Sequence, residues 1–224
     1  MISILLFTLV INGSLFLVRS AGSFTTSSPN LYGVAGKLTF AQKIKKADGK
    51  LYVGGHSNGT VGTGSVGDFD LFIRKFPNGD STTTSPLWTR MFGTSGTDYL
   101  GDFAVDASGN VFAVGMCSGT VNGVASKGSG DACIFKLNST GSTQCSAQYG
   151  GTGVDRFNGV ALDETNGYFY AVGNTTSSSF NGTSTVGKAA GIFFRFQLSN
   201  CALSGRCTLV PKQCTSAASL CSAR

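Results

Sequence analysis

Two aspartates at equivalent places in the chain are the first residues whose type could carry chemistry. Asp98 and Asp155 each follow a glycine-containing segment, and 57 residues separate them in a chain of 224. Two carboxylates beside a central channel could act as acid and nucleophile on a glycosidic bond. One functional hypothesis is therefore an extracellular enzyme that acts on polysaccharide. The recurrence itself favours a structural role, because a catalytic group normally breaks a repeat instead of following it.

Other residues with chemical potential have simpler interpretations. His56, the only histidine, could be a general base, but no partner stands at a suggestive spacing, so we expect it in an ordinary loop after a strand. Segments 106–110 and 163–167 lack the ligand pattern of a calcium loop and predict Asx turns. Packing is favoured over sugar stacking for four aromatic residues, Trp88, Phe92, Tyr99 and Tyr149. The sequence assigns no catalytic, cofactor-binding or metal-binding residue.

The cysteines predict disulfides. Four of the seven fall in the last 24 residues, which indicates a stapled tail in an oxidising compartment. A single histidine and the lack of a Cys-x-x-Cys pair argue against zinc. Cys133 and Cys145 lie on neighbouring strands of a predicted hairpin and could be bridged, which leaves Cys117 as an odd thiol. Pairing of Cys117 with the tail is one option, and the sequence does not fix the connectivity. The candidate disulfide cysteines are Cys133, Cys145, Cys201, Cys207, Cys214 and Cys221.

The beginning of the chain predicts export. Residues 1–22 are mostly apolar and end in small residues, as a secretory signal peptide does, and residues 23–36 are predicted to be a linker. Retention of residues 1–22 as an anchor stays open, although a spanning helix needs ~20 apolar residues. We predict a secreted, extracellular protein without a stable membrane span. The candidate glycosylation sites are Asn58, Asn138, Asn174 and Asn181.

Composition narrows the class of protein and of partner. Only 12% of residues are charged, whereas 32 glycines and 17 phenylalanines accompany many short apolar runs, which is typical of an all-β protein with many turns. The net charge is +6, but no pattern of interleaved bases and aromatics indicates nucleic acid. One basic cluster, Lys43, Lys45, Lys46 and Lys50, predicts a solvated hairpin end, with contact to an anionic glycan or lipid as the alternative.

The chain repeats itself three times, and the repeat predicts the fold. Each unit holds an apolar strand aligned at Gly54, Gly115 or Gly173, followed by a loop and a second apolar strand. Polar turns between the short apolar runs predict four strands in each unit of about 60 residues, as in a propeller blade. The predicted units are 37–92, 93–149 and 150–199, followed by a Cys-rich tail at 200–224.

At these residues the chain resembles the secreted β-propeller-repeat proteins, named for a seven-bladed propeller. The second unit carries most of the motif: Trp88, Phe92-Gly93, Asp98, Asp106, Gly109-Asn110-Val111, Gly115, Gly130-Asp131-Ala132 and Phe135-Lys136-Leu137. The resemblance implies a partial or open propeller of about three four-stranded antiparallel blades, and it is nearly silent on function.

Three blades do not close a ring, since propellers typically have four to eight. The sequence leaves three explanations open: a partial chain, closure through oligomerisation, or capping of the end blades by the terminal segments. We expect the recurring cations Lys75, Lys136 and Arg195 to pair with the recurring aspartates. The leading functional hypothesis is a secreted non-catalytic binding or structural module with an extracellular protein or glycan partner. Self-association through open blade edges is a further hypothesis.

Overall fold

The computed structural model describes residues 7–11, 14–18, 33–64, 67–77, 85–185 and 188–209. These residues form strands and turns, and none of them belongs to a helix. Accordingly, the described part of the chain offers no helix with the length and apolarity that a membrane crossing requires. Most of the expected signal peptide (1–22) and linker (23–36) lies outside these ranges; the described part is a hairpin of β1 (Phe7–Ile11) and β2 (Ser14–Val18) and residues 33–36.

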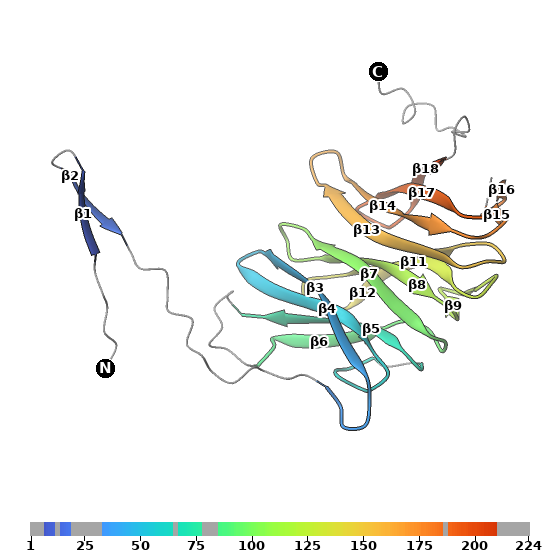
Figure 1. The fold of residues 1–224 in the computed structure, drawn as a ribbon, viewed down its shortest axis with the longest axis horizontal. Coiled ribbons are helices and arrows are strands. Elements are labelled where there is room, and N and C mark those ends of the chain that lie inside the picture. Colours follow the sequence, from blue (N-terminus) through green and yellow to red (C-terminus); the bar gives the residue numbers. More distant parts are fainter. Residues whose placement is uncertain are drawn as a thin grey trace, which may run out of the picture.

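Three four-stranded antiparallel sheets make up the body of the molecule (Figure 1). Sheet 1 contains β3 (Thr39–Ala47), β4 (Lys50–Ser57), β5 (Asp70–Phe76) and β6 (Trp88–Phe92). Sheet 2 contains β7 (Asp98–Val105), β8 (Val111–Cys117), β11 (Asp131–Leu137) and β12 (Thr143–Tyr149). Sheet 3 contains β13 (Asp155–Asp163), β14 (Tyr168–Thr175), β17 (Ala190–Gln197) and β18 (Leu203–Leu209). Two small hairpins extend the loops of sheets 2 and 3: β9 (Thr120–Val121) with β10 (Val124–Ala125), and β15 (Ser179–Phe180) with β16 (Thr183–Ser184).

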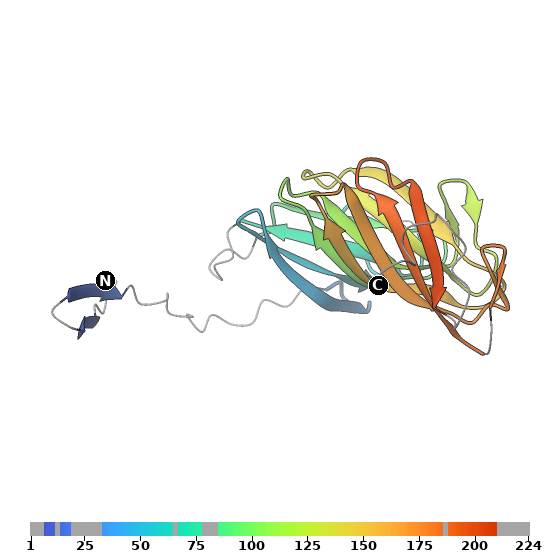
Figure 2. The same ribbon diagram turned by 90° about the horizontal axis from the view of Figure 1, so that it is seen from above.

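The sheets pack face to face in chain order. Seen from above, sheets 1 and 3 lie at opposite ends of the stack (Figure 2). Junction 1, between sheets 1 and 2, buries Tyr52 and Phe103, and junction 2, between sheets 2 and 3, buries Phe112 and Phe194. Because sheet 2 is covered on both faces, its central strands β8 and β11 are buried almost throughout. The predicted all-β fold with four-stranded antiparallel units is confirmed.

A β-bulge recurs at one position in the first strand of every sheet. The bulges lie opposite Gly55, Gly115 and Gly173, where a Cβ would come within 1.7, 2.0 and 1.9 Å of a carbonyl oxygen of the bulged strand. Glycine is therefore required at these three places. The sequence alignment on Gly54 is wrong by one residue, because strand pairing makes Gly54 equivalent to Val114 and Val172.

The described part of the predicted Cys-rich tail, residues 200–209, belongs to sheet 3 instead of a separate module. It supplies β18, the outer strand of that sheet. Cys201, in the turn before β18, is bonded to Cys145 on the outer strand of sheet 2. The disulfide therefore joins two sheets. The side chain of Cys207 and all of Cys214 and Cys221 lie outside the described residues.

The second disulfide joins Cys117 to Cys133 within sheet 2, so the expected bridge between Cys133 and Cys145 is wrong. Cys133 belongs to the apolar cluster of junction 1, whereas Cys145 packs against that of junction 2. The two side chains therefore lie on opposite faces of the same sheet. Cys117 and Cys133 share one face and sit on adjacent strands, which brings their Cα atoms to 5.8 Å.

Candidate functional site

The four recurring aspartates meet in two pairs, one at each junction. Asp70 and Asp98 converge on Gly93: a Cβ on that glycine would lie 2.8 Å from Asp70 Oδ1 and 2.3 Å from Asp98 Oδ2. Asp131 and Asp155 form the second pair, next to Gly150. All four carboxylates are buried. The structure thus brings the candidate acids together, but at sites between the sheets that solvent does not reach.

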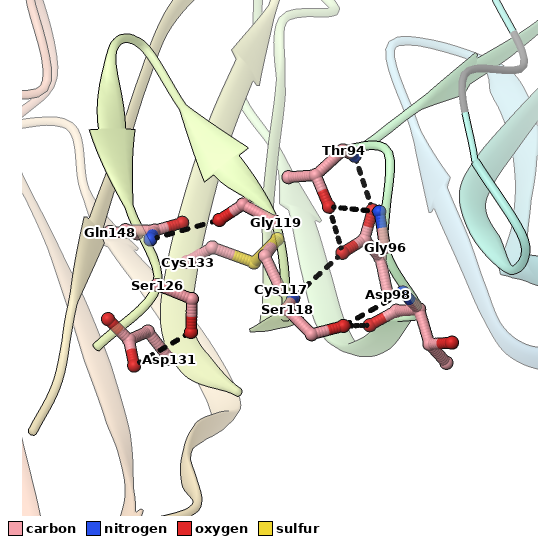
Figure 3. Close-up of a disulfide and its surroundings, with 11 residues drawn as sticks. Thr94, Gly96, Asp98, Cys117, Ser118, Gly119, Ser126, Asp131, Cys133 and Gln148 are labelled. Atoms are coloured by element: carbon pink, nitrogen blue, oxygen red, sulfur yellow. Dashed lines mark hydrogen bonds between the residues drawn. A yellow bond between two sulfur atoms is a disulfide. The ribbon is translucent and has the colours of Figure 1, made fainter. Parts of the chain in front are cut away.

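These carboxylates accept hydrogen bonds from neighbouring loops and therefore have a structural role. Asp98 accepts from the backbone N–H and hydroxyl of Thr94 and from the N–H of Ser118, at 2.8 Å for the hydroxyl and 3.1 Å for Ser118. Asp155 accepts from the N–H of Gly151 at 2.7 Å and from the hydroxyls of Thr175 and Ser177. Figure 3 shows Asp98 and Asp131 on opposite sides of the Cys117–Cys133 disulfide. The aspartates anchor the loops that enter and leave each blade-like unit.

Burial also sets the ionisation of these groups. It raises the pKa of Asp98 to about 6, against the opposing hydrogen bonds from Thr94 and Ser118, and the nearby Asp70 carboxylate adds to the rise. Burial raises the pKa of Asp131 in the same way, with a smaller contribution from Asp155. A carboxyl group with a raised pKa suits general acid catalysis, but a group without solvent access cannot touch a polysaccharide. The geometry favours the structural interpretation.

The recurring cations do not follow the expected pattern. Lys75 pairs with Asp48, in the β3–β4 turn, at 3.0 Å. Lys136 donates to the carbonyl oxygen of Leu198 at 2.7 Å, across junction 2. Arg195 lies 4.5 Å from the centre of the Tyr168 ring. The expected pairing with the recurring aspartates is wrong. In sheets 1 and 2 the third strand begins at an aspartate and carries its lysine near the other end, and Asp98 and Asp155 begin the first strands β7 and β13.

His56 lies inside β4, not in the expected loop. Its ring is surrounded by Phe40, Phe69 and Tyr99, with ring centres 5.2, 5.8 and 4.8 Å away. Burial lowers the pKa of the imidazole. These contacts make His56 part of an aromatic cluster at junction 1.

The predicted turns are found where the sequence places them, and three of the four expected aromatics pack between the sheets. Asp106 accepts hydrogen bonds from the backbone N–H groups of Ser108 and Asn110, which closes an Asx turn. Trp88 donates to the carbonyl oxygen of Ser139 at 3.0 Å, across junction 1. Phe92 and Tyr149 pack against Phe135 and Phe194 respectively, whereas Tyr99 stays partly exposed beside His56.

The candidate glycosylation sites are half-buried asparagines at turns and strand ends. The side-chain oxygens of Asn58, Asn138 and Asn174 already accept hydrogen bonds. Asn181 lies in the β15–β16 turn with a positive φ of 46°. Glycosylation at these four residues stays a prediction. Within the described ranges, no three His, Cys, Asp or Glu side chains gather closely enough to hold a metal ion.

The feature that sequence reasoning missed is the outward face of sheet 3. Tyr170 and Val172 on β14 and Phe193 on β17 form what we call the open face, with the two aromatic rings stacked at 5.6 Å. Val172 is 43% exposed. Their equivalents in sheet 1 (Tyr52, Gly54, Ile73) and sheet 2 (Phe112, Val114, Ile134) are buried against the next sheet. One sequence signal indicates this surface: β14 carries apolar residues at successive positions, so both faces of the strand are apolar, although only one of them packs against sheet 2.

A pocket of about 490 Å³ occupies the open face. Besides the open face itself, its lining includes Gly159, Val160 and Ala161 of β13. Among the described residues that line it, the charged one is Asp102 of sheet 2, whose carboxylate lies 3.4 Å from the Lys45 amine. The pocket is thus an apolar surface with a single carboxylate at one side. No protein-family model and no curated protein matches this chain.

Proposed function

We propose that this chain is a secreted, non-catalytic protein-binding module, built as an open propeller of three blades, and that it binds through the open face of sheet 3. One observation carries the proposal: Tyr170, Val172 and Phe193 occupy positions that sheets 1 and 2 bury against a following sheet, yet in sheet 3 they face outward. An exposed apolar patch of this kind marks an interaction site.

The propeller interpretation rests on the repeat and on the resemblance to secreted propeller proteins. Each sheet has the same strand order, the same bulge opposite a glycine and apolar faces that stack on its neighbours. Export is supported by the two disulfides, since such bonds persist in oxidising compartments.

A folded protein suits this face better than a glycan does. Sugar-binding sites depend on polar groups that hold hydroxyls, and the pocket lining offers one carboxylate among apolar and glycine residues. The cores of protein interfaces, in contrast, are apolar and rich in aromatic residues. Three of the four candidate sugar-stacking residues, Trp88, Phe92 and Tyr149, are engaged in contacts between sheets.

The alternative of an extracellular enzyme is less well supported. Its candidate acids, Asp98 and Asp155, are buried and hydrogen-bonded to the loops that they anchor. A hydrolase assay on Asp98→Ala and Asp155→Ala would revive the enzyme if turnover were lost while folding stayed intact.

Hydroxyl-radical footprinting tests the binding proposal. We expect Tyr170 and Phe193 to be labelled strongly in the very dilute purified protein and weakly in the concentrated culture fluid of the cells that make it. Tyr99, which is also partly exposed but lies away from the open face, is the internal control. Equal labelling of Tyr170 under both conditions would contradict the proposal.

A further inference from the structure

The structural repeat indicates which surface can cover the open face of sheet 3. We propose that the open face of sheet 3 binds the outward face of sheet 1 of a second copy of this chain, so that two copies close a ring of six blades. This inference rests on the proposed function, because it names the partner for the same surface.

The internal junctions show which residues a following blade brings to the open face. At junction 1, Gly54 is the equivalent of Val172, and a Cβ on Gly54 would lie 2.9 Å from Leu100 and 2.8 Å from Phe103. Leu100 and Phe103 both belong to the first strand of the following sheet. Val172 therefore requires a first strand with apolar residues at these same two positions.

Sheet 1 carries apolar residues at those positions and leaves them uncovered. Strand pairing makes Ala41 and Ile44 the equivalents of Leu100 and Phe103. Both are exposed, Ile44 to 63%, whereas Leu100 and Phe103 are buried. Phe72 and Phe76, on the same face of sheet 1, are already buried, so the exposed part of this face lies along β3. Sheet 3 thus exposes Val172, and β3 exposes the two residues that Val172 requires.

Side-chain size is complementary across the inferred contact. At junction 1 the smallest residue, Gly54, faces the large pair Leu100 and Phe103. At the inferred contact the larger Val172 would face the smaller pair Ala41 and Ile44. A valine in place of Gly54 at junction 1 would be overpacked, since that space is already filled. Sheet 1 of a second copy therefore fits Val172 better than sheet 2 would.

Charge is complementary as well. The first strands of the three sheets, β3, β7 and β13, each contain a bulge, and the residues that follow these bulges are Lys43, Asp102 and Gly159. In the ring, Lys43 of the second copy would stand next to Gly159, whose other neighbour is Asp102. The glycine leaves a gap in the pocket wall, and Asp102 lines that pocket. A second lysine thus arrives on the side of the pocket where Asp102, which already pairs with Lys45 of its own chain, supplies the carboxylate, and this favours the orientation of the two copies.

Two copies bring together a suitable number of blades. The described part of the chain supplies three four-stranded sheets, so two copies supply six, within the four to eight blades that propellers typically have. The contact is head-to-tail, so each copy uses both of its end faces, and a head-to-tail contact forms a closed ring when its rotation closes. Closure by two copies covers both exposed faces at once.

Light scattering of the purified full chain at micromolar concentration tests the inference, and we expect twice the mass of one chain. Val172→Asp and Ile44→Asp should each give a monomer, because each places an uncompensated charge in the contact and raises the dissociation constant roughly 100-fold or more. The matched control is Val124→Asp on β10, which is 47% exposed and lies outside the contact, and it should leave the dimer intact. Thermal unfolding of each variant shows that it is folded.

Three outcomes would overturn the inference. If Val172→Asp abolishes the dimer and Ile44→Asp does not, the open face binds another open face and the ring does not form. If the purified chain is a monomer while Tyr170 and Phe193 are protected in culture fluid, the partner is a different protein and the proposed function stands. If the chain is a monomer and both residues are labelled everywhere, the proposed function fails together with the inference.

Discussion

Alanine at Gly115 tests the view that the bulge and its facing glycine define each unit. A Cβ at residue 115 would lie 2.0 Å from the carbonyl oxygen of Tyr99 and 3.1 Å from its carbonyl carbon. Because Cβ atoms essentially never come within 3.0 Å of such atoms, the two strands must separate by about 1 Å. The obstructing atoms belong to the backbone, and β8 is buried between two sheets, so no flexible side chain can move aside.

The expected cost follows from this geometry. Overpacking in a core costs roughly 1–3 kcal/mol, and each ladder hydrogen bond weakened beside the bulge adds about 1 kcal/mol. We therefore expect Gly115→Ala to lower the free energy of unfolding by about 3 kcal/mol. For a protein of this length, that change corresponds to a Tm lower by roughly 6–12 °C.

Differential scanning calorimetry at one dilute concentration measures the effect. The matched control is Gly159→Ala, which lies next to the equivalent bulge of sheet 3; its Cβ would meet a methyl group of the exposed Val172 at 3.2 Å. That side chain can turn away, so the control should change the Tm by less than about 3 °C. Equal Tm values for Gly115→Ala and the wild-type protein would refute the role given to the glycine.

Two further predictions concern charge and covalent links. Burial raises the pKa of Asp98 from 3.8 to about 6, so the stability that its neutral form provides is present below pH 4 and is lost as the pH rises through 6. The free energy of unfolding of the wild-type protein relative to Asp98→Asn should therefore fall by roughly 2 kcal/mol between pH 4 and pH 7 in urea titrations, and a constant difference would contradict the shift. Removal of Cys145 and Cys201 by double alanine substitution should cost about 4 kcal/mol, and removal of Cys117 and Cys133 about 3 kcal/mol, because the first bond closes 56 residues and the second 16. The reverse order, measured by denaturant unfolding, would show that chain entropy does not govern these bonds.

Local patterns in the sequence predicted much of the fold. The apolar runs around residues 133–135 and 192–194 indicate central strands covered on both faces. Both are central strands of their sheets, but only β11 is covered on both faces, whereas Phe193 of β17 lies on the open face. The Asp, Gly and Asn residues of segment 106–110 predicted the turn that Asp106 closes. Each of these signals depends on neighbours within a few residues, so one sequence is enough to interpret it.

Features that depend on pairing between strands could not be predicted in the same way. Gly54 and Gly55 are adjacent, and only the bulge in β3 shows which of them is the equivalent of Gly115. Cys133 and Cys145 lie on neighbouring strands, but the faces that their side chains occupy depend on the register, which shifts between Lys136 and Leu137. The register in which two strands pair cannot be derived from one sequence alone.

The open face was missed for a similar reason. Val172 belongs to the same class of strand position as Val114, and the sequence around the two is alike. One is buried and the other exposed because a third sheet follows Val114 and no described sheet covers Val172. The cysteines of segment 200–224 predict a separate tail, whereas its residues 203–209 form the strand β18 of sheet 3.

The Cys145–Cys201 disulfide has a consequence for the mechanics of the molecule. Under tension applied at its two ends, the chain transmits force through this bond and past the 56 residues that it spans. At up to ~3.5 Å per residue, roughly 200 Å of extension is withheld until the bond is reduced. In the described part of the chain, sheet 1 is held to sheet 2 by packing, hydrogen bonds and the Lys45–Asp102 ion pair alone. Tension would therefore detach sheet 1 first, while sheets 2 and 3 stay joined as a covalent pair.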